Sequence, residues 1–216
     1  AEMLDHPDIV IVDVPLKAES HARHVPGARL LDFKQLVGSN DDDIPGVPSP
    51  EALSGVMSAL GITRDSHVVA YDDEGGGWAG RLIWVLDCIG HTKYSYVNGG
   101  IVAWRQAGLP EESGEVTPRS SDYKITAINE NATFTKAQVL DNLGKPDFAI
   151  WDARSAAEYT GEKVISARGG HIPGAVNYEW TLGMDKDRGL RIKDLNAFRT
   201  LLSDMGIDET KRIATH

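Results

Sequence analysis

Cysteine is nearly absent from this sequence, which has one among 216 residues. A single cysteine excludes an internal disulfide and suits a reducing compartment, so we expect a cytoplasmic protein. No apolar run approaches the roughly 20 residues that cross a bilayer, so no membrane partner is expected. Positive charge is also scarce, and the net charge of −10 argues against nucleic acid as a partner. An anionic substrate would therefore need a local positive site.

The sequence is built as a tandem repeat, with three segments that recur in the same order. In the second half these segments are Ala149–Arg154, Gly170–Asn177 and Arg212–His216, and their counterparts in the first half are Val10–Asp13, His24–Arg29 and His67–Asp72. Asp13 and Asp152 lie 139 positions apart, whereas His24 and His171 lie 147 apart. The second copy therefore carries eight extra residues, around 161–170.

Short apolar runs alternate with stretches of helical spacing in both copies, which predicts an α/β fold. We expect two tandem domains, each an open parallel sheet flanked by helices. Residues 1–110 form the first domain, 111–122 are a linker rich in Pro, Ser and Glu, and 123–216 form the second domain. The second domain is predicted to open with a strand at Tyr123–Ala127. Ligands in such sheets bind beyond the carboxyl ends of the strands.

The repeat places Tyr71 opposite His216, and Asp72 opposite the residue that would follow His216. After Asp72 the first copy continues with a predicted helix, strand and helix. We therefore expect the sequence to be truncated at both ends or to be one piece of a cut chain, and we expect residues 1–216 alone to fold poorly.

Three motifs carry a resemblance to a known family. They are the repeated His-(Ile/Val)-Pro-Gly-Ala of His24 and His171, the Asp152-Ala-Arg-Ser155 strand end and the loop Tyr71-Asp-Asp-Glu-Gly-Gly-Gly-Trp-Ala-Gly-Arg81. Together they resemble the two-domain rhodaneses, the thiosulfate:cyanide sulfurtransferases, of the bacterial type. The resemblance covers nearly the whole chain.

The resemblance implies a silent N-terminal domain and a catalytic C-terminal domain. A loop cysteine in the second domain accepts the outer sulfur of thiosulfate as a persulfide and passes it to cyanide or a thiol. The counterpart of that cysteine in the first domain is Asp72, which cannot form a persulfide, and the cysteine itself is expected immediately after His216. A loop leading into a helix N-terminus would lower the thiolate pKa. No metal or organic cofactor is implied, and we expect a monomer.

Arg154, Trp180 and His216 are the candidate substrate-binding or site-lining residues. Arg154 is basic, lies at a strand end and corresponds to Pro15 in the first copy. Several family members have a second, substrate-contacting arginine four residues later, where this chain has Glu158. Lys163 and Arg168, in the extra residues, are expected to be solvated, with guidance of the anion as a minor alternative. Cys88 lies in an apolar helix and is expected to be a buried structural thiol.

Other functions remain open from the sequence. A mercaptopyruvate sulfurtransferase would share these motifs and differ in the active loop. Phosphatases of related fold have a longer loop and are disfavoured by the tandem architecture. A non-catalytic sulfur carrier or binding module would lack the cysteine after His216.

Overall fold

The fold is seen in a computed structural model, which describes residue 4, residues 6–39 and residues 46–216. The chain forms two compact units. The first unit comprises Ala1–Ala132 and Lys186–Arg191, and the second comprises Thr133–Asp185 and Ile192–His216. No helix in the described ranges is both long and apolar enough to cross a membrane.

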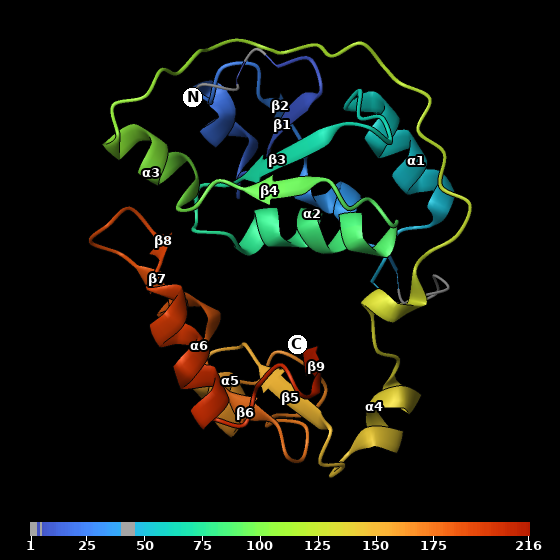
Figure 1. Cartoon of the computed structure of the whole chain (residues 1–216), viewed down its shortest axis with the longest axis vertical. Helices are drawn as coiled ribbons and strands as arrows, with labels where there is room; N and C mark the ends of the chain where they lie inside the picture. Colours follow the sequence, from blue (N-terminus) through green and yellow to red (C-terminus); the bar gives the residue numbers. More distant parts are fainter. Residues whose placement is uncertain (1–3, 5, 40–45) are drawn as a thin grey trace. The chain divides into compact units, whose positions relative to one another are not determined.

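Strands alternate with α-helices and 3₁₀ helices (η) in the first unit (Figure 1). In chain order they are β1 Ile9–Asp13, η1 Ala18–Ala22, β2 Arg29–Leu30, η2 Phe33–Leu36, α1 Pro50–Ala59, β3 His67–Tyr71, α2 Gly77–Cys88, β4 Tyr94–Tyr96, α3 Gly100–Gln106 and η3 Glu130–Ala132.

The sheet of the first unit has the strand order β2-β1-β3-β4, and every neighbouring pair is parallel. The central pair runs in register from Ile9 opposite His67 to Asp13 opposite Tyr71. β1 is a run of β-branched residues ending in an acid, as expected of a strand buried on both faces.

The two faces of this sheet have separate cores because side chains alternate along a strand. Val10 and Val12 point to the face covered by α1 and α2, and Ile11 points to the face covered by α3. Both faces are therefore closed by helices, as predicted.

The segment after α3 packs along the first unit as extended chain (Figure 1). Tyr123 and Ile125 are buried in the core beside α1 and α2. Their backbone N–H groups donate to the hydroxyls of Ser58 and Ser54 on α1. The predicted strand at Tyr123–Ala127 is therefore wrong, because helix side chains rather than a neighbouring strand satisfy this backbone. This segment belongs to the first compact unit, so the structure differs here from a second domain starting at Tyr123.

The second unit repeats the alternation. Its elements are α4 Lys136–Asn142, β5 Phe148–Asp152, α5 Ala156–Thr160, β6 Val176–Asn177, η4 Trp180–Gly183, β7 Met184–Asp185, β8 Arg191–Ile192, α6 Leu195–Asp204 and β9 Arg212–Thr215, of which β8 begins at the boundary between the units.

The main sheet of the second unit has the order β6-β5-β9 and is parallel. β5 is central, with Phe148 opposite Arg212 and Trp151 opposite Thr215. β7 and β8 form a separate two-stranded sheet. Because β5 is central and all three strands are parallel, their carboxyl ends meet at one edge, and the candidate site lies at that edge.

Candidate active site

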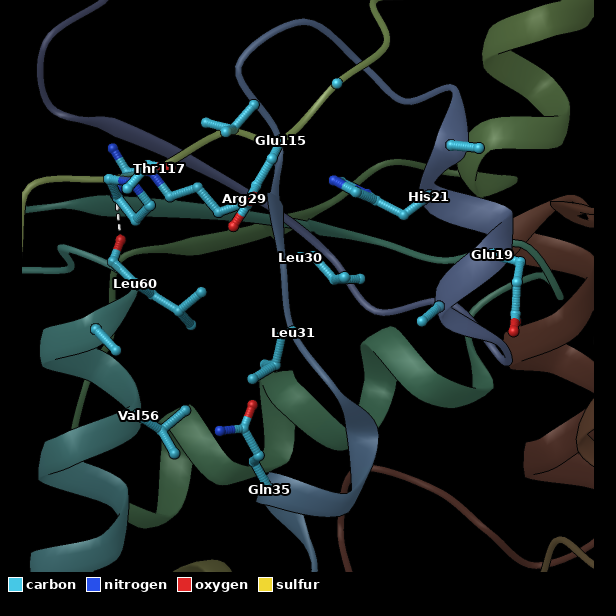
Figure 2. A pocket seen from close by; sticks show the side chains of 16 residues that line it. Glu19, His21, Arg29, Leu30, Leu31, Gln35, Val56, Leu60, Glu115 and Thr117 are labelled. Atoms are coloured by element: carbon cyan, nitrogen blue, oxygen red, sulfur yellow. Dashed lines mark hydrogen bonds between the residues drawn. The ribbon is translucent and has the colours of Figure 1, made fainter.

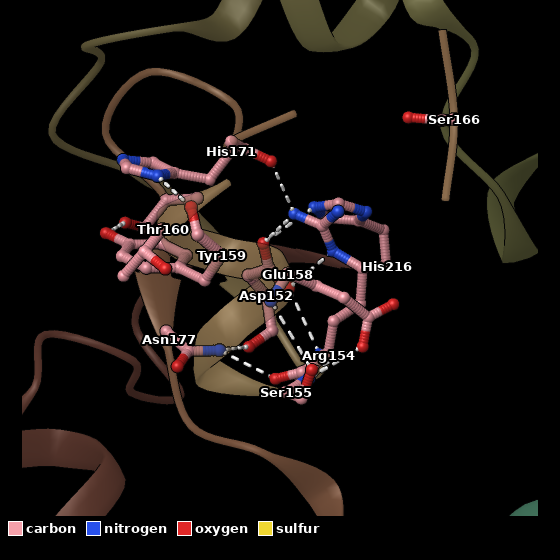
Figure 3. Close-up of polar contacts among 12 residues, drawn as sticks. Asp152, Arg154, Ser155, Glu158, Tyr159, Thr160, Ser166, His171, Asn177 and His216 are labelled. Carbon is pink, nitrogen blue, oxygen red and sulfur yellow. Dashed lines mark hydrogen bonds and ion pairs between the residues drawn. The ribbon is translucent and has the colours of Figure 1, made fainter. Parts of the chain in front are cut away.

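The site is centred on Asp152, the last residue of β5. Its side chain is fully buried. Charged side chains are rarely fully buried unless they are paired, so Asp152 is expected to have a basic partner. The preceding residues pair with β6 on one side and β9 on the other, which fixes the carboxylate at the carboxyl edge of the sheet. Figure 3 shows the polar contacts around Asp152.

Arg154 pairs with Asp152 through two parallel hydrogen bonds. Its Nε donates to Oδ1 at 2.9 Å and its Nη2 donates to Oδ2 at 2.5 Å, while its backbone N–H also donates to Oδ1 at 3.1 Å. Nη2 further donates to the carbonyl of Gly170 at 3.0 Å. Arginine suits this position because its planar guanidinium matches a carboxylate in a two-point contact.

His216 is the second basic group on this carboxylate. Its Nε2 lies 3.2 Å from Oδ2 of Asp152. Burial alone would raise the pKa of the Asp152 carboxyl, but the hydrogen bonds from Arg154 and the nearby charge of His216 bring that pKa below its ordinary value. The hydrogen bond to Asp152 correspondingly raises the pKa of Arg154. The carboxylate is therefore charged and compensated at neutral pH.

Helix α5 begins next to this group with a reciprocal cap. The Ser155 hydroxyl accepts from the Glu158 N–H, and the Glu158 carboxylate accepts from the Ser155 N–H and hydroxyl. The hydrogen bond from Ser155 lowers the pKa of Glu158, and the charge of Lys163 acts in the same direction. Glu158 is thus held as a carboxylate.

A cavity of about 450 Å³ lies at this edge of the second unit. It is lined by Ala153, Arg154, Ser155, Glu158, Lys163, Glu179, Trp180 and His216. The structure therefore brings together the three residues selected from the sequence, Arg154, Trp180 and His216. Trp180 is 40% exposed, so it stands at the mouth rather than in a core.

Other lining residues were not selected from the sequence. The spacing of Ser155 and Glu158 is that of a capping box and could have predicted their mutual hydrogen bonds. No pattern in the sequence predicts that Glu179 lines the cavity. The contact of Arg154 with Gly170 could not be predicted either, because it depends on the path of the extra residues around 161–170.

Asp72 lies in the first unit, at the end of β3, and it is fully buried. Its Oδ1 accepts from the N–H groups of Glu74, Gly75 and Gly76 at 2.9–3.1 Å. Its Oδ2 accepts from those of Gly76, Trp78 and Ala79 at 3.0–3.1 Å. Five backbone N–H groups at the start of α2 thus surround one anion, an arrangement favoured at helix N-termini.

A larger cavity of about 680 Å³ is present in the first unit (Figure 2). It is lined by residues of η1, β2, η2, α1 and the segment 114–118. Arg29 lies in its wall and donates to the carbonyl of Leu60, and burial lowers the pKa of Arg29. None of the residues selected from the sequence lines this cavity.

The repeated histidines make structural contacts. His24 is fully buried, stacks on His21 with 4.1 Å between ring centroids and lies 3.0 Å from the Gly114 carbonyl. His171 stacks on Tyr159 at 3.7 Å, and its Nδ1 lies 2.8 Å from the carbonyl of that residue. Both rings therefore connect the segment before a strand to another part of the same unit. In the part of the chain that the structure describes, no group of three or more His, Cys, Asp or Glu could hold a metal.

Comparisons with known proteins bear on this geometry. The family profile described as "Rhodanese-like domain" matches residues 1–107 and 135–216. A thiosulfate sulfurtransferase of Azotobacter vinelandii is 43% identical over 99% of this chain and 78% of that protein. A thiosulfate sulfurtransferase of Pseudomonas aeruginosa is 39% identical over 100% and 79%. The crystal structure of a 3-mercaptopyruvate sulfotransferase from Escherichia coli superposes with a TM-score of 0.86 at 28% identity, over 99% of this chain and 84% of that one.

Proposed function

The chain belongs to the rhodanese family, with two tandem domains of that fold, and from this premise we propose that it is a thiosulfate sulfurtransferase. It moves the outer sulfur of thiosulfate to cyanide or to a thiol through a cysteine persulfide. The relatives named thiosulfate sulfurtransferase, at 43% and 39% identity, support this choice of donor.

One observation supports the position of the nucleophile. The N–H of Val14 donates to the carbonyl of Tyr71 at 2.9 Å, and the N–H of Ala153 donates to the carbonyl of His216 at 2.9 Å. Tyr71 and His216 are therefore equivalent positions in equivalent strands. The residue after His216 then corresponds to Asp72, and we propose that it is the persulfide-forming cysteine.

The surroundings of Asp72 indicate what such a position offers. A loop of the same form after His216 would surround a thiolate with backbone N–H groups and would end at a helix N-terminus. These donors favour the charged form and so lower the thiol pKa. In the first unit the same donors are occupied by the Asp72 carboxylate, so we assign no sulfur transfer to that unit.

The proposed reaction has two steps. The thiolate attacks the outer sulfur of thiosulfate, a sulfur–sulfur bond forms to the cysteine, and the bond to the inner sulfur breaks as sulfite leaves with the electron pair. Cyanide or a thiolate then attacks the outer sulfur of the persulfide, and the cysteine thiolate leaves. The cycle needs no other electron donor or acceptor.

The lining residues have supporting roles in this proposal. Arg154 and His216 hold the Asp152 carboxylate at the carboxyl edge of the sheet, beside the strand after which the loop would follow. Trp180 limits the mouth of the cavity.

The test is an assay of the full-length protein with thiosulfate and cyanide. We expect thiocyanate from the wild type, none when the residue after His216 is replaced by serine or alanine, and near-normal turnover in Cys88→Ser. Absence of thiocyanate in the wild type, or a residue other than cysteine after His216, would refute the proposal.

A second donor is supported by the similarity to a 3-mercaptopyruvate sulfotransferase. Measuring kcat/KM for thiosulfate and for 3-mercaptopyruvate in one preparation separates the two, and we expect thiosulfate to be preferred. We also propose a cytoplasmic monomer, which size-exclusion chromatography with light scattering and cell fractionation would check.

A further inference from the structure

The cavity of the second unit contains more negative than positive charge. Besides the buried Asp152, its wall carries Glu158 and Glu179. Arg154 is paired with Asp152, which compensates its positive charge, and His216 also contacts that carboxylate. Lys163 is the remaining basic residue among those lining the cavity. An anionic donor entering this site therefore depends on Lys163 for compensation near the mouth.

Lys163 combines a fixed backbone with an exposed side chain. Its N–H donates to the carbonyl of Ala157 at 2.9 Å, which ties it to α5. Its side chain is 60% exposed, and its Nζ lies 3.7 Å from Oε2 of Glu158, longer than a hydrogen bond. Because Glu158 is already hydrogen-bonded by Ser155, the ammonium can leave it at little cost.

The two ends of the loop that carries Lys163 lie close together. Gly161 adopts a left-handed backbone at the end of α5, and a Cβ on Gly169 would lie 3.2 Å from the Cα of Gly161. Arg154 holds the far end through the Gly170 carbonyl. The first copy lacks these residues, so they are an addition to the second unit that brings a cation to its cavity.

We propose that Lys163 is an anion-binding residue of this site, whose ammonium turns from Glu158 to the sulfonate oxygens of thiosulfate as the donor enters. The inference rests on the proposed function. The charges explain why such a residue is needed: a dianion approaches a protein of net charge −10 and a cavity lined by the carboxylates of Glu158 and Glu179. An exposed lysine in the cavity wall gives a local attraction that acts within about 10 Å at 0.1 M salt.

The experiment compares Lys163→Gln with Arg168→Gln in the full-length protein. Both variants remove one positive charge from the same loop, but Arg168 does not line the cavity. We expect Lys163→Gln to raise the KM for thiosulfate about two- to fivefold at low salt with kcat unchanged, the range given by an exposed ion pair. Arg168→Gln should leave KM unchanged, Lys163→Arg should restore it, and the difference should disappear at about 1 M salt.

Calorimetric titration with thiosulfate, which needs no turnover, separates the two proposals. Suppose that Lys163→Gln binds thiosulfate more weakly than Arg168→Gln, but the wild type makes no thiocyanate. The proposed role of Lys163 in anion binding would then be supported, and the proposed sulfurtransferase activity would be refuted. Normal turnover with equal KM and equal binding in both variants would overturn the role of Lys163 and leave the proposed function standing. An equal loss in both variants would also overturn it, because only the general charge of the loop would then matter.

Discussion

The imidazole of His216 contacts the buried carboxylate of Asp152, with 3.2 Å between Nε2 and Oδ2. The equivalent pair in the first unit is Tyr71 and Asp13, in which the tyrosine hydroxyl faces the carboxylate. The same strand-end acid is therefore retained in both units, whereas the group that faces it changes from a phenol to a base. In the first unit a histidine, His21, lies 2.6 Å from Asp13, so a second side chain contacts the acid in both units.

Removing Arg154 should destabilise the second unit. Arg154→Ala leaves the fully buried Asp152 with His216 and a single backbone donor, and breaking a buried pair from one side costs about 3–5 kcal/mol. Because the Arg154 side chain is 23% exposed, we expect the lower part of this range. Denaturant unfolding followed by circular dichroism measures the change.

Arg154→Lys is the matched control for charge. Lysine keeps the positive charge but cannot make the two parallel hydrogen bonds. We therefore expect the free energy of unfolding of Arg154→Lys to lie between those of the wild type and Arg154→Ala. If Arg154→Ala unfolds at the same denaturant concentration as the wild type, Arg154 does not anchor Asp152 and is free for the substrate.

Cys88 should be dispensable for turnover. It is fully buried in α2, and burial raises the pKa of its thiol to about 11, which is unsuitable for a nucleophile at neutral pH. Cys88→Ser should lower the free energy of unfolding by about 1–3 kcal/mol, since a hydroxyl without a partner is left in an apolar core. Thiocyanate formation below the unfolding transition should stay near the wild-type rate. A folded Cys88→Ser protein without turnover would place the chemistry in the first unit.

The sequence predicted the parts of the fold that follow from local patterns and from the repeat. The apolar runs ending in Asp13 and Asp152 predicted buried parallel strands, and the repeat predicted that Tyr71 and His216 are equivalent. The prediction from the sequence is wrong at Tyr123–Ala127, where the alternating pattern indicates a strand. In the structure the backbone N–H groups of this segment donate to the hydroxyls of Ser54 and Ser58 instead. A hydrogen-bond partner about seventy residues away leaves no mark on a local pattern.

The site was predictable only in part for the same reason. Arg154 and Trp180 were selected because they follow strand ends, where such sheets bind ligands, and His216 because it immediately precedes the expected nucleophile. Their joint lining of one cavity with Lys163 and Glu179 depends on the path of the loop after α5, which no spacing in the sequence determines.

Asp72 should be essential to the first unit. Its carboxylate accepts six hydrogen bonds from backbone N–H groups, and each bond to a charged group contributes about 1.5–3 kcal/mol. Asp72→Asn replaces one acceptor oxygen by a donor that faces other donors, so we expect a loss of more than about 2 kcal/mol in the free energy of unfolding. Asp65→Asn is the control, because the Asp65 side chain is exposed and its loss should cost less than about 1 kcal/mol. Equal stability of the two variants would contradict the anion cradle inferred at Asp72.

His91 should make the stability of the first unit depend on pH. It is buried, its Nε2 donates to the Ser66 carbonyl at 3.0 Å, and its Nδ1 lies 3.0 Å from the Tyr123 hydroxyl. Since a carbonyl can only accept, the proton is on Nε2 and the neutral ring satisfies both contacts. Burial lowers the pKa of His91 from its ordinary 6.5, and the charges of Arg64 and Lys93 add to this effect.

The sign of the dependence follows from which state binds the proton. Below about pH 6.5 the unfolded chain protonates His91 while the folded protein does not, so the free energy of unfolding falls as the pH falls through this range. Above pH 6.5 neither state is protonated and the contribution of His91 is constant. One proton gives a limiting slope of about 1.4 kcal/mol per pH unit, which flattens once the pH is below the folded pKa.

Urea unfolding of the wild type and of His91→Gln between pH 5 and 8 would test this dependence. His91→Gln should be less stable than the wild type at pH 7.5, because glutamine fits the two contacts poorly, and its stability should fall less steeply between pH 6.5 and 5. Lys93→Gln should reduce the slope only slightly, since it removes one of the two charges that oppose protonation while the burial remains. Equal slopes in the wild type and His91→Gln would show that another group causes the loss of stability in acid.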